Sequence, residues 1–159
     1  MMNRETTRAP RAEVAARATV ALEAAAVRAA RRLERHAADY ELSDAKLEVL
    51  AVLGECESRC CCLHELGDEL RVTRPNVTKL VDGLERCGMV ERVRHPTDGR
   101  MVQARLTAAG AALAERALPG RTTSMQDYWD VLDDEEIETL TGLLERVSDP
   151  ARTRGEIRA

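Results

Sequence analysis

Residues 63–107 read LHELGDELRVTRPNVTKLVDGLERCGMVERVRHPTDGRMVQARLT, and this stretch decides the fold. Two short segments with apolar residues at helical spacing are separated by a short turn at Arg71-Val72, and two alternating segments follow around a turn-forming sequence. This order predicts two helices joined by a tight turn and then a β-hairpin. That is the layout of a winged helix-turn-helix domain.

The two helices have recognisable beginnings and ends. The first is expected over residues 63–70, where three leucines recur at i, i+3 and i+7. For the second, Thr73 is a good N-cap because its hydroxyl can accept from a free backbone N–H, and Pro75 falls in the first turn, where its missing N–H costs little. We expect this helix to run to about Cys87, with Gly88 as its C-cap.

The second helix has two chemically different faces. Its apolar face, which should pack inward, consists of Val77, Leu80, Val81 and Leu84. The opposite face carries Arg74, Asn76, Thr78, Lys79 and Asp82. Arginine and lysine suit guanine or phosphate, and asparagine suits adenine. A helix of about 22 Å is also long enough to lie in a major groove. The pattern therefore predicts double-stranded DNA as the partner.

The hairpin is expected from strands at residues 89–94 and 101–106, which alternate roughly between apolar and polar residues. Pro96, Asp98 and Gly99 form the turn between them. The residues near its tip are basic, namely Arg94, His95 and Arg100. A basic tip can enter a minor groove, where arginine senses groove width and negative potential.

Each piece alone also has a simpler interpretation. A charged helix face is usually just a solvated face, and Arg92, Arg94 and Arg105 could be edge-strand charges that discourage aggregation. A winged helix can also be a protein-interaction module without DNA specificity. Such a module would expose apolar anchors, whereas the outer face here is polar and basic. The helix, turn and hairpin in this order and spacing favour DNA binding.

As a set, these residues resemble the MarR family of bacterial transcription regulators. The resemblance covers Leu42 to Gly110, which is under half of the chain, and the helical flanks agree with the family's layout. The matching motifs are Leu63-x-x-Leu66-Gly67, Thr73-Arg74-Pro75-Asn76-Val77-Thr78-Lys79-Leu80-Val81-Asp82-x-Leu84-Glu85-x-x-Gly88-Met89-Val90-Glu91-Arg92, Asp98-x-Arg100 and Leu106-Thr107-x-x-Gly110.

The resemblance implies a homodimer that recognises a pseudo-palindromic operator with one recognition helix per half-site, in most members as a repressor. On this basis the residues expected to contact DNA from the recognition helix are Thr73, Arg74, Pro75, Asn76, Thr78 and Lys79. Those expected from the wing are Arg94, His95, Asp98 and Arg100. Arg100 would enter the minor groove, with Asp98 orienting it. Gly99 stands where many members carry a charged residue, so this wing tip should have less charge and more freedom.

The composition bounds the class of protein. The chain has 159 residues, 44% hydrophobic but only 2% aromatic, so the core must be built from Ala, Leu and Val. No apolar run approaches the ~20 residues of a membrane span, and no signal-peptide pattern opens the chain. We therefore expect a cytoplasmic protein without membrane contact. The net charge of -4 argues against a general polyanion binder, and the strongly acidic C-terminal arm cannot be a DNA surface.

The fold class expected is mainly α with a small β-sheet, that is α+β. The winged helix-turn-helix domain should occupy residues 42–110, and residues 10–41 and 111–150 should form a helical dimerisation region from both chain ends. Residues 1–9 and 151–159 are expected to be disordered. Within the flanks, Thr107 should cap a helix that Pro119-Gly120 breaks or kinks. Asp133 should cap the last helix through a capping box with Glu136.

The five cysteines are a second unusual feature, with three interpretations. In the favoured one, Cys60, Cys61 and Cys62 form the third strand of the sheet as small apolar residues, and Cys87 is buried at a helix end. In the second, oxidation of an exposed, low-pKa thiol alters DNA binding. The third is a zinc-responsive regulator that binds metal through Cys56, Cys60, Cys62 and His64. Adjacent cysteines on a strand point to opposite faces, which disfavours the metal site.

Two further hypotheses concern small molecules. Family members often bind small aromatic acids, and a cationic group of Arg32, Arg35 and His36 could hold such an effector's carboxylate, although a solvated helix face is the favoured explanation. No catalytic constellation is present, because the sequence lacks a Gly-rich phosphate loop, a nucleophile elbow and a His-Glu-x-x-His motif. We therefore expect no enzyme and no required cofactor.

Overall fold

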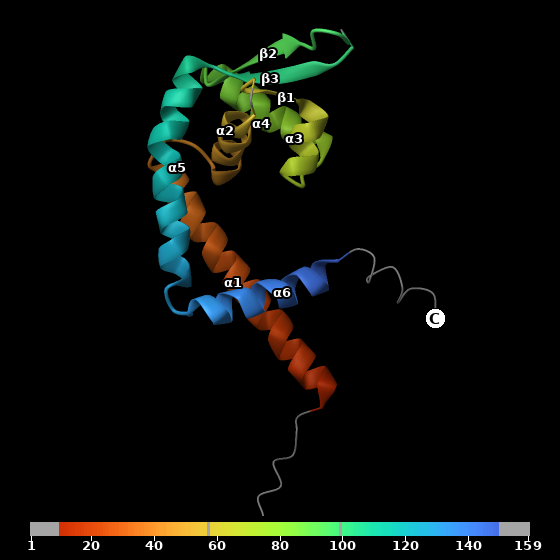
Figure 1. Cartoon of the computed structure of the whole chain (residues 1–159), viewed down its shortest axis with the longest axis vertical. Coiled ribbons are helices and arrows are strands. Elements are labelled where there is room, and N and C mark those ends of the chain that lie inside the picture. The colour runs from red at the N-terminus through yellow and green to blue at the C-terminus, as the bar shows by residue number, and fades with distance from the viewer. Residues whose placement is uncertain (1–9, 57, 99, 150–159) are drawn as a thin grey trace, which may run out of the picture. The chain divides into compact units, whose positions relative to one another are not determined.

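The computed structural model describes residues 10–56, 58–98 and 100–149. This part of the chain is mainly helical with one small sheet, as predicted (Figure 1). It forms two units, one up to Ser124 and one from Met125, and each is described by itself. The elements in chain order are α1 Arg11–Ala38, α2 Asp44–Glu55, β1 Cys60–Cys62, α3 Leu63–Glu69, α4 Arg74–Arg86, β2 Val90–Arg94, β3 Val102–Leu106, α5 Ala108–Trp129 and α6 Asp134–Ser148.

Two of the predictions concern residues that the structure does not describe. The expected disorder of residues 1–9 and 151–159 and the expected freedom of Gly99 lie outside the described residues. None of the described helices is long and apolar enough to cross a membrane.

The sheet is antiparallel with strand order β1-β3-β2. Ala104 of β3 lies opposite Cys61 of β1 on one side and Arg92 of β2 on the other. The prediction that Cys60–Cys62 forms a third strand is confirmed. The short β1 leads directly into α3, so the sheet and the first helix of the helix-turn-helix share one continuous segment.

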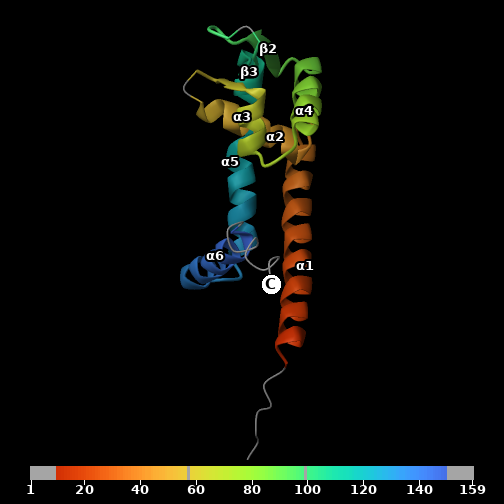
Figure 2. The same cartoon turned by 90° about the vertical axis from the view of Figure 1, so that its right-hand side faces the viewer.

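The core of the winged helix lies between α2, α3, α4 and the sheet. Leucines and valines fill it at full burial, and the fully buried large side chains are Leu47, Val49, Leu50, Leu53, Leu66, Val77, Val81, Leu84 and Val90. Those of α4 recur at i, i+4 and i+7, as its apolar stripe predicts. Burial of this stripe fixes which side of α4 faces outward. Figure 2 shows α1 extending as one long helix beyond these elements.

The end of α4 is set by Gly88. This residue has a left-handed φ of 71°, which glycine adopts without strain. Its N–H donates to Glu85 O, and the next N–H, of Met89, donates to Leu84 O at 3.0 Å. These two bonds form a Schellman motif, which satisfies carbonyls at the helix end. The predicted C-terminal stop is therefore confirmed, and the turn sends the chain into β2.

The beginning of α4 differs in detail from the prediction. Thr73 is the N-cap residue, but its hydroxyl makes no capping hydrogen bond. Pro75 occupies one of the positions whose N–H would be a donor, and the Asn76 N–H donates to the backbone oxygen of Thr73 instead. Thr73 itself is exposed on the surface of the domain.

α5 begins as predicted, but of the predicted break or kink at Pro119-Gly120 the break does not occur. The Thr107 hydroxyl accepts from the Gly110 N–H at 3.0 Å and donates to Gly88 O, so Thr107 caps the helix. The helix nevertheless continues through Pro119 and Gly120 to Trp129. Contacts on both sides of this dipeptide hold the backbone helical. His36 bonds to Ala117 O before it, and Arg121 pairs with Asp44 after it.

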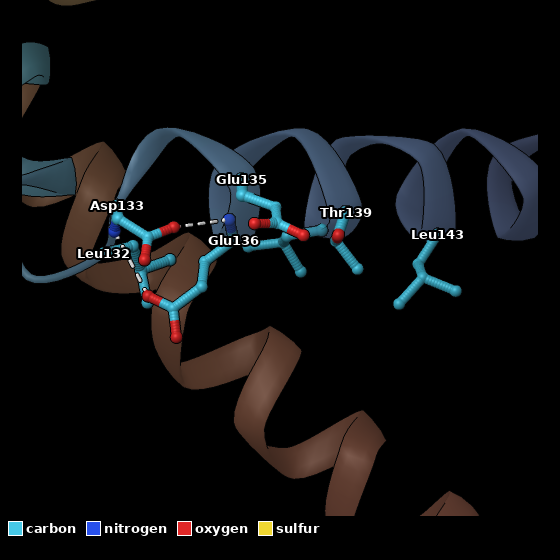
Figure 3. Close-up of a pocket in the computed structure, with 7 residues that line it drawn as sticks. Leu132, Asp133, Glu135, Glu136, Thr139 and Leu143 are labelled. Atoms are coloured by element: carbon cyan, nitrogen blue, oxygen red, sulfur yellow. Dashed lines mark hydrogen bonds between the residues drawn. The ribbon is translucent and has the colours of Figure 1, made fainter.

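The second unit contains α6, whose predicted start is confirmed. Asp133 accepts from the Glu136 N–H at 2.8 Å, and the Glu136 carboxylate accepts from the Asp133 N–H at 3.1 Å. Figure 3 shows both hydrogen bonds of this capping box. None of the residues of α6 is buried. The helix therefore exposes apolar side chains, including Leu143, which is half exposed.

Candidate nucleic-acid interface

The outward side of α4 is polar and open to solvent. The buried valines and Leu84 hold the helix against the core, and the opposite side chains are exposed. All six residues predicted to contact DNA from this helix are among them: Thr73, Arg74, Pro75, Asn76, Thr78 and Lys79. The structure thus brings these side chains together on one rigid element, with polar groups free to meet phosphates and base edges.

The wing presents three of its four predicted residues at the surface. Arg94, Asp98 and Arg100 are exposed, whereas His95 is half-buried. His95 Nδ1 lies 3.2 Å from the Asp98 N–H, from which it accepts a hydrogen bond. His95 therefore organises the turn of the hairpin.

Asp98 acts on Arg100 through the main chain. Its Oδ1 accepts from the Arg100 backbone N–H at 3.0 Å. The Met101 N–H donates to Asp98 O at 3.0 Å, which closes the same turn. This arrangement fixes the backbone from which the Arg100 side chain projects. The contact expected between Asp98 and Arg100 is thus present at the backbone.

Arg92 joins the wing to the recognition helix, and sequence reasoning did not find this role. From β2 its Nη2 lies 2.6 Å from Asp82 Oδ1, and its Nη1 pairs with Glu85 Oε2. Its backbone N–H also donates to Glu85 Oε1 at 3.1 Å. Asp82 had been grouped with the DNA-reaching face; it is exposed there, but its carboxylate is held by Arg92. The positions of Asp82 and Glu85 along α4 do not by themselves indicate a partner in β2.

The guanidinium of Arg92 stays charged in this setting. Partial burial by itself would lower the pKa of Arg92, but the hydrogen bonds to Glu85 and Asp82 outweigh that effect and raise it. A second pair, Arg105 with Glu91 at 2.8 Å, lies on the other face of the sheet, because neighbouring strand residues point to opposite sides. Arg92 therefore contacts α4, whereas Arg105 pairs within the sheet.

A hollow opens between the start of α3, the start of α4 and β3. It is lined by Leu63, His64, Arg74, Thr78, Met101 and Val102. His64, a candidate metal ligand, therefore shares this hollow with Arg74 and Thr78, two of the predicted DNA contacts, rather than with a group of cysteines. Among the described residues, no three His, Cys, Asp or Glu side chains gather as a metal site would require.

The cysteines divide by burial. Cys62 is buried and Cys60 and Cys61 are half-buried, in agreement with the small-apolar interpretation of the strand. Cys87 is exposed, so the prediction that it is buried was wrong. The reason is that α4 ends at Arg86, and the chain turns away before position 87 can continue the apolar stripe.

The three cysteine thiols of β1 have raised pKa values and therefore form the thiolate less readily. Burial, with the nearby Cys56 and Glu65 adding to it, raises the pKa of Cys61 to about 12. Burial also raises the pKa of Cys60 and of Cys62. Because the thiolate is the reactive form, these three positions are unsuited to rapid oxidation at neutral pH.

The candidate effector residues of α1 are engaged within the protein. Arg32 Nε donates to Ser124 O at 2.6 Å, and His36 Nε2 lies 2.8 Å from Ala117 O. Arg35 Nε donates to Arg31 O one turn back at 3.3 Å. Arg32 and His36 therefore fasten α1 to α5, which is a structural task that the sequence did not indicate.

Comparison of the sequence with known proteins identifies its family. A sequence model of the MarR family matches residues 40–101. The HTH-type transcriptional repressor YetL of Bacillus subtilis is 33% identical over 120 residues, which cover 73% of this chain and 72% of YetL. The chain belongs to the MarR family. Membership confirms both the resemblance and the winged helix-turn-helix fold inferred from residues 63–107.

Two solved structures of this family are similar to the protein over most of its length. One is Sco3205, a MarR family transcriptional regulator from Streptomyces coelicolor, in complex with DNA; it is 26% identical, has a TM-score of 0.80 and shares 91% coverage of each chain. The other is a mutant of Escherichia coli MarR complexed with operator DNA, at 27% identity and a TM-score of 0.75, covering 82% of this chain and 93% of that one. These relatives of the MarR family are transcriptional regulators.

Proposed function

We propose that this MarR-family protein is a homodimeric, sequence-specific DNA-binding repressor that acts in the cytoplasm. Each subunit would place α4 in the major groove of one half of a pseudo-palindromic operator. The observation that carries the proposal is the exposed polar side of α4, held outward by the buried stripe beneath it. The similarity to a relative named as a repressor and to regulators bound to DNA supports the assignment.

The side chains divide the work according to their chemistry. Arg74 and Asn76, in the first turn of α4, would read base edges, since arginine pairs with guanine and asparagine with adenine. Thr78 and Lys79, one turn further, would contact bases or phosphates. Arg100 would enter the minor groove from the wing, whose turn is held by Asp98.

The dimer is supported by apolar surface that neither unit covers by itself. Residues 11–28 of α1 are all exposed, including Val20 at 65% and Val27 at 49%. In the second unit Val147 of α6 is 73% exposed. Water-exposed apolar faces of this extent mark association surfaces. A second copy of the chain is the occupant proposed here.

The proposed function is regulation rather than catalysis, and it requires no cofactor. Side chains alone read DNA, so neither a metal nor an organic group is needed. Arg32, Arg35 and His36 each hydrogen-bond within the protein, so we do not place an effector carboxylate on them.

The experiment is fluorescence anisotropy with the purified full chain, the DNA upstream of its own gene and a scrambled duplex of equal length. Binding that resists scrambled competitor and weakens steeply with salt is expected, because phosphate contacts release counterions. If the operator lies elsewhere in the genome, selection of bound fragments from genomic DNA with the same protein would find it. No preferred sequence in either assay would refute DNA-specific regulation and favour a protein-interaction module.

Two variants test the residues. Lys79→Ala and Arg100→Ala should each weaken operator binding by roughly 1–3 kcal/mol if each makes a specific contact. Glu55→Ala, at the exposed end of α2 and outside both the proposed DNA contacts and the proposed dimer surface, is the surface control and should leave binding unchanged. Unchanged affinity in both arginine and lysine variants would contradict the assigned interface.

A further inference from the structure

The DNA-facing side of α4 continues into two carboxylates. Arg74, Thr78 and Asp82 stand at i, i+4 and i+8 and therefore share one side of the helix, with Glu85 three residues beyond. The first two are proposed DNA contacts. Unpaired acids directly beyond them would repel the phosphates of a bound duplex. The interface therefore needs something that holds these two acids.

The side chain of Arg92 contacts three residues on this side of α4. Its guanidinium contacts Asp82 at 2.6 Å, pairs with Glu85, and reaches the backbone oxygen of Thr78 at 3.5 Å. These positions span about two turns of the helix. One planar group in β2 is therefore fixed against the length of α4 that includes a proposed DNA contact.

Glu85 binds both the main chain and the side chain of Arg92. One of its carboxylate oxygens accepts from the Arg92 backbone N–H, and the other pairs with the guanidinium of the same residue. The helix is thereby tied to both the main chain and the side chain of β2. Rotation of α4 relative to the wing would break all of these contacts at once.

Stability alone is a weak reason for this cluster. The Arg92 side chain is 25% exposed, and its partners Asp82 and Glu85 are 50% and 40% exposed. Ion pairs so open to water contribute little to folding. A planar fork that engages two carboxylates and a carbonyl does, however, constrain geometry, which a lysine's point charge would not reproduce.

We propose that Arg92 is a positioning residue for operator recognition: it fixes the rotation of α4 relative to the wing and masks the carboxylates of Asp82 and Glu85. The proposal rests on the proposed function, because it assumes that α4 reads an operator. Arg92 need not touch DNA itself. It acts through the placement of Arg74 and Thr78.

The test uses variants that change charge in opposite directions. Arg92→Ala removes a positive charge, whereas the double variant Asp82→Asn with Glu85→Gln removes two negative charges. Electrostatics alone predicts weaker DNA binding for the first and tighter binding for the second, on any sequence. Loss of positioning predicts that both lose operator preference, measured as the ratio of the dissociation constants for scrambled and operator DNA.

The sheet offers matched controls. Arg105→Ala and Glu91→Gln alter an ion pair between β3 and β2 on the face of the sheet away from α4. We expect Arg92→Ala and the double variant each to lose operator preference at least fivefold, and both controls to keep it within twofold. Arg92→Lys should lose part of the preference although its charge is retained. This conservative variant and the double variant keep the test valid if Arg92→Ala does not fold, as judged by circular dichroism.

The outcomes separate the two claims. Wild-type preference in Arg92→Ala, or an equal loss in Arg105→Ala, would overturn the positioning role. So would a double variant that binds all DNA more tightly with its operator preference intact. A wild-type protein without any operator preference would instead overturn the proposed function, and the positioning role with it.

Discussion

The ring of His36 lies against Gly120 so closely that a Cβ atom at position 120 would be 2.7 Å from His36 Cε1. The same ring places Nε2 at 2.8 Å from Ala117 O and packs edge-on against Tyr40, with ring centroids 5.4 Å apart. The glycine therefore makes room for the side chain through which α1 is fastened to α5.

This relationship predicts a sign for Gly120→Ala. Alanine is favoured over glycine by about 1 kcal/mol in a helix interior, yet the added methyl must displace His36 and break its hydrogen bond. We expect the variant to lower the free energy of unfolding by about 1 kcal/mol, since the lost bond and packing exceed the propensity gain. Urea unfolding at fixed protein concentration measures it.

The sign should reverse when His36 is absent. In a His36→Ala background, Gly120→Ala should stabilise the protein by roughly 0.5–1 kcal/mol, because only the helix propensity remains. Gly142→Ala in α6 is the control, since nothing lies near its Cβ position, and it should be stabilising in both backgrounds. A stabilising Gly120→Ala in the wild-type background would contradict the close contact.

Pro119 offers a second prediction in the same helix. The residue is exposed and lies inside α5, where it removes one backbone hydrogen bond. Pro119→Ala should raise the free energy of unfolding by about 1–3 kcal/mol, the upper end being the full helix penalty of proline. Both thermal unfolding and urea unfolding should show the higher stability of the variant. A lower stability in this variant would mean that the proline is needed for the native course of α5.

Glu65 predicts a pH dependence. The hydrogen bond from the Cys62 backbone N–H, at 3.0 Å, outweighs burial and lowers the pKa of Glu65 from its ordinary value of 4.5. A carboxyl whose pKa is lowered by folding stabilises the protein above the unfolded value and loses that contribution as pH falls through the folded one. The stability difference between wild type and Glu65→Gln should therefore be full at pH ~6 and shrink towards pH ~3.

The matched control for this titration is Glu69→Gln, at the other end of the same short helix. Urea unfolding across the pH range gives both differences. If the wild-type advantage over Glu65→Gln grew as the pH fell, the proposed direction of the pKa shift would be wrong.

The thiols predict an order of chemical modification. Cys87 is exposed, whereas burial raises the pKa of Cys61 to about 12 and also raises that of Cys60 and Cys62. Brief iodoacetamide treatment of the native protein at pH ~8, followed by peptide mass spectrometry, should label Cys87 first and the strand thiols last. Cys87→Ser should remove the fast phase. Fast labelling of Cys61 would instead favour the thiol-sensing hypothesis.

The recognition helix shows how far local patterns reach. The apolar stripe of α4, the glycine that ends it and the polar residues on its other side are all properties of neighbouring residues, so they could be predicted. The same holds for the hairpin and for the capping box at Asp133. The polar and basic residues on the outer side of α4 predicted DNA as the partner, and their exposure agrees with that prediction. The family motif added the expectation of a homodimer on a pseudo-palindromic operator.

Contacts between distant segments could not be predicted in this way. The partners of Arg92 lie in α4, and those of His36 and Arg32 lie in α5, far along the chain. The sequence predicts a break or kink at Pro119-Gly120 because the local preference of proline is against a helix. The contacts of Ala117 and Arg121 on either side of it overrode that preference.

The sequence by itself determined the elements, the outward face of α4 and the family, because spacing, capping and turn chemistry act between residues a few positions apart. Only the tertiary structure decided that Arg92 holds Asp82 and Glu85 and that α5 runs through Pro119. The physical reason is that these outcomes depend on which side chains meet after the chain has folded, and a local pattern carries no information about a partner that another segment supplies.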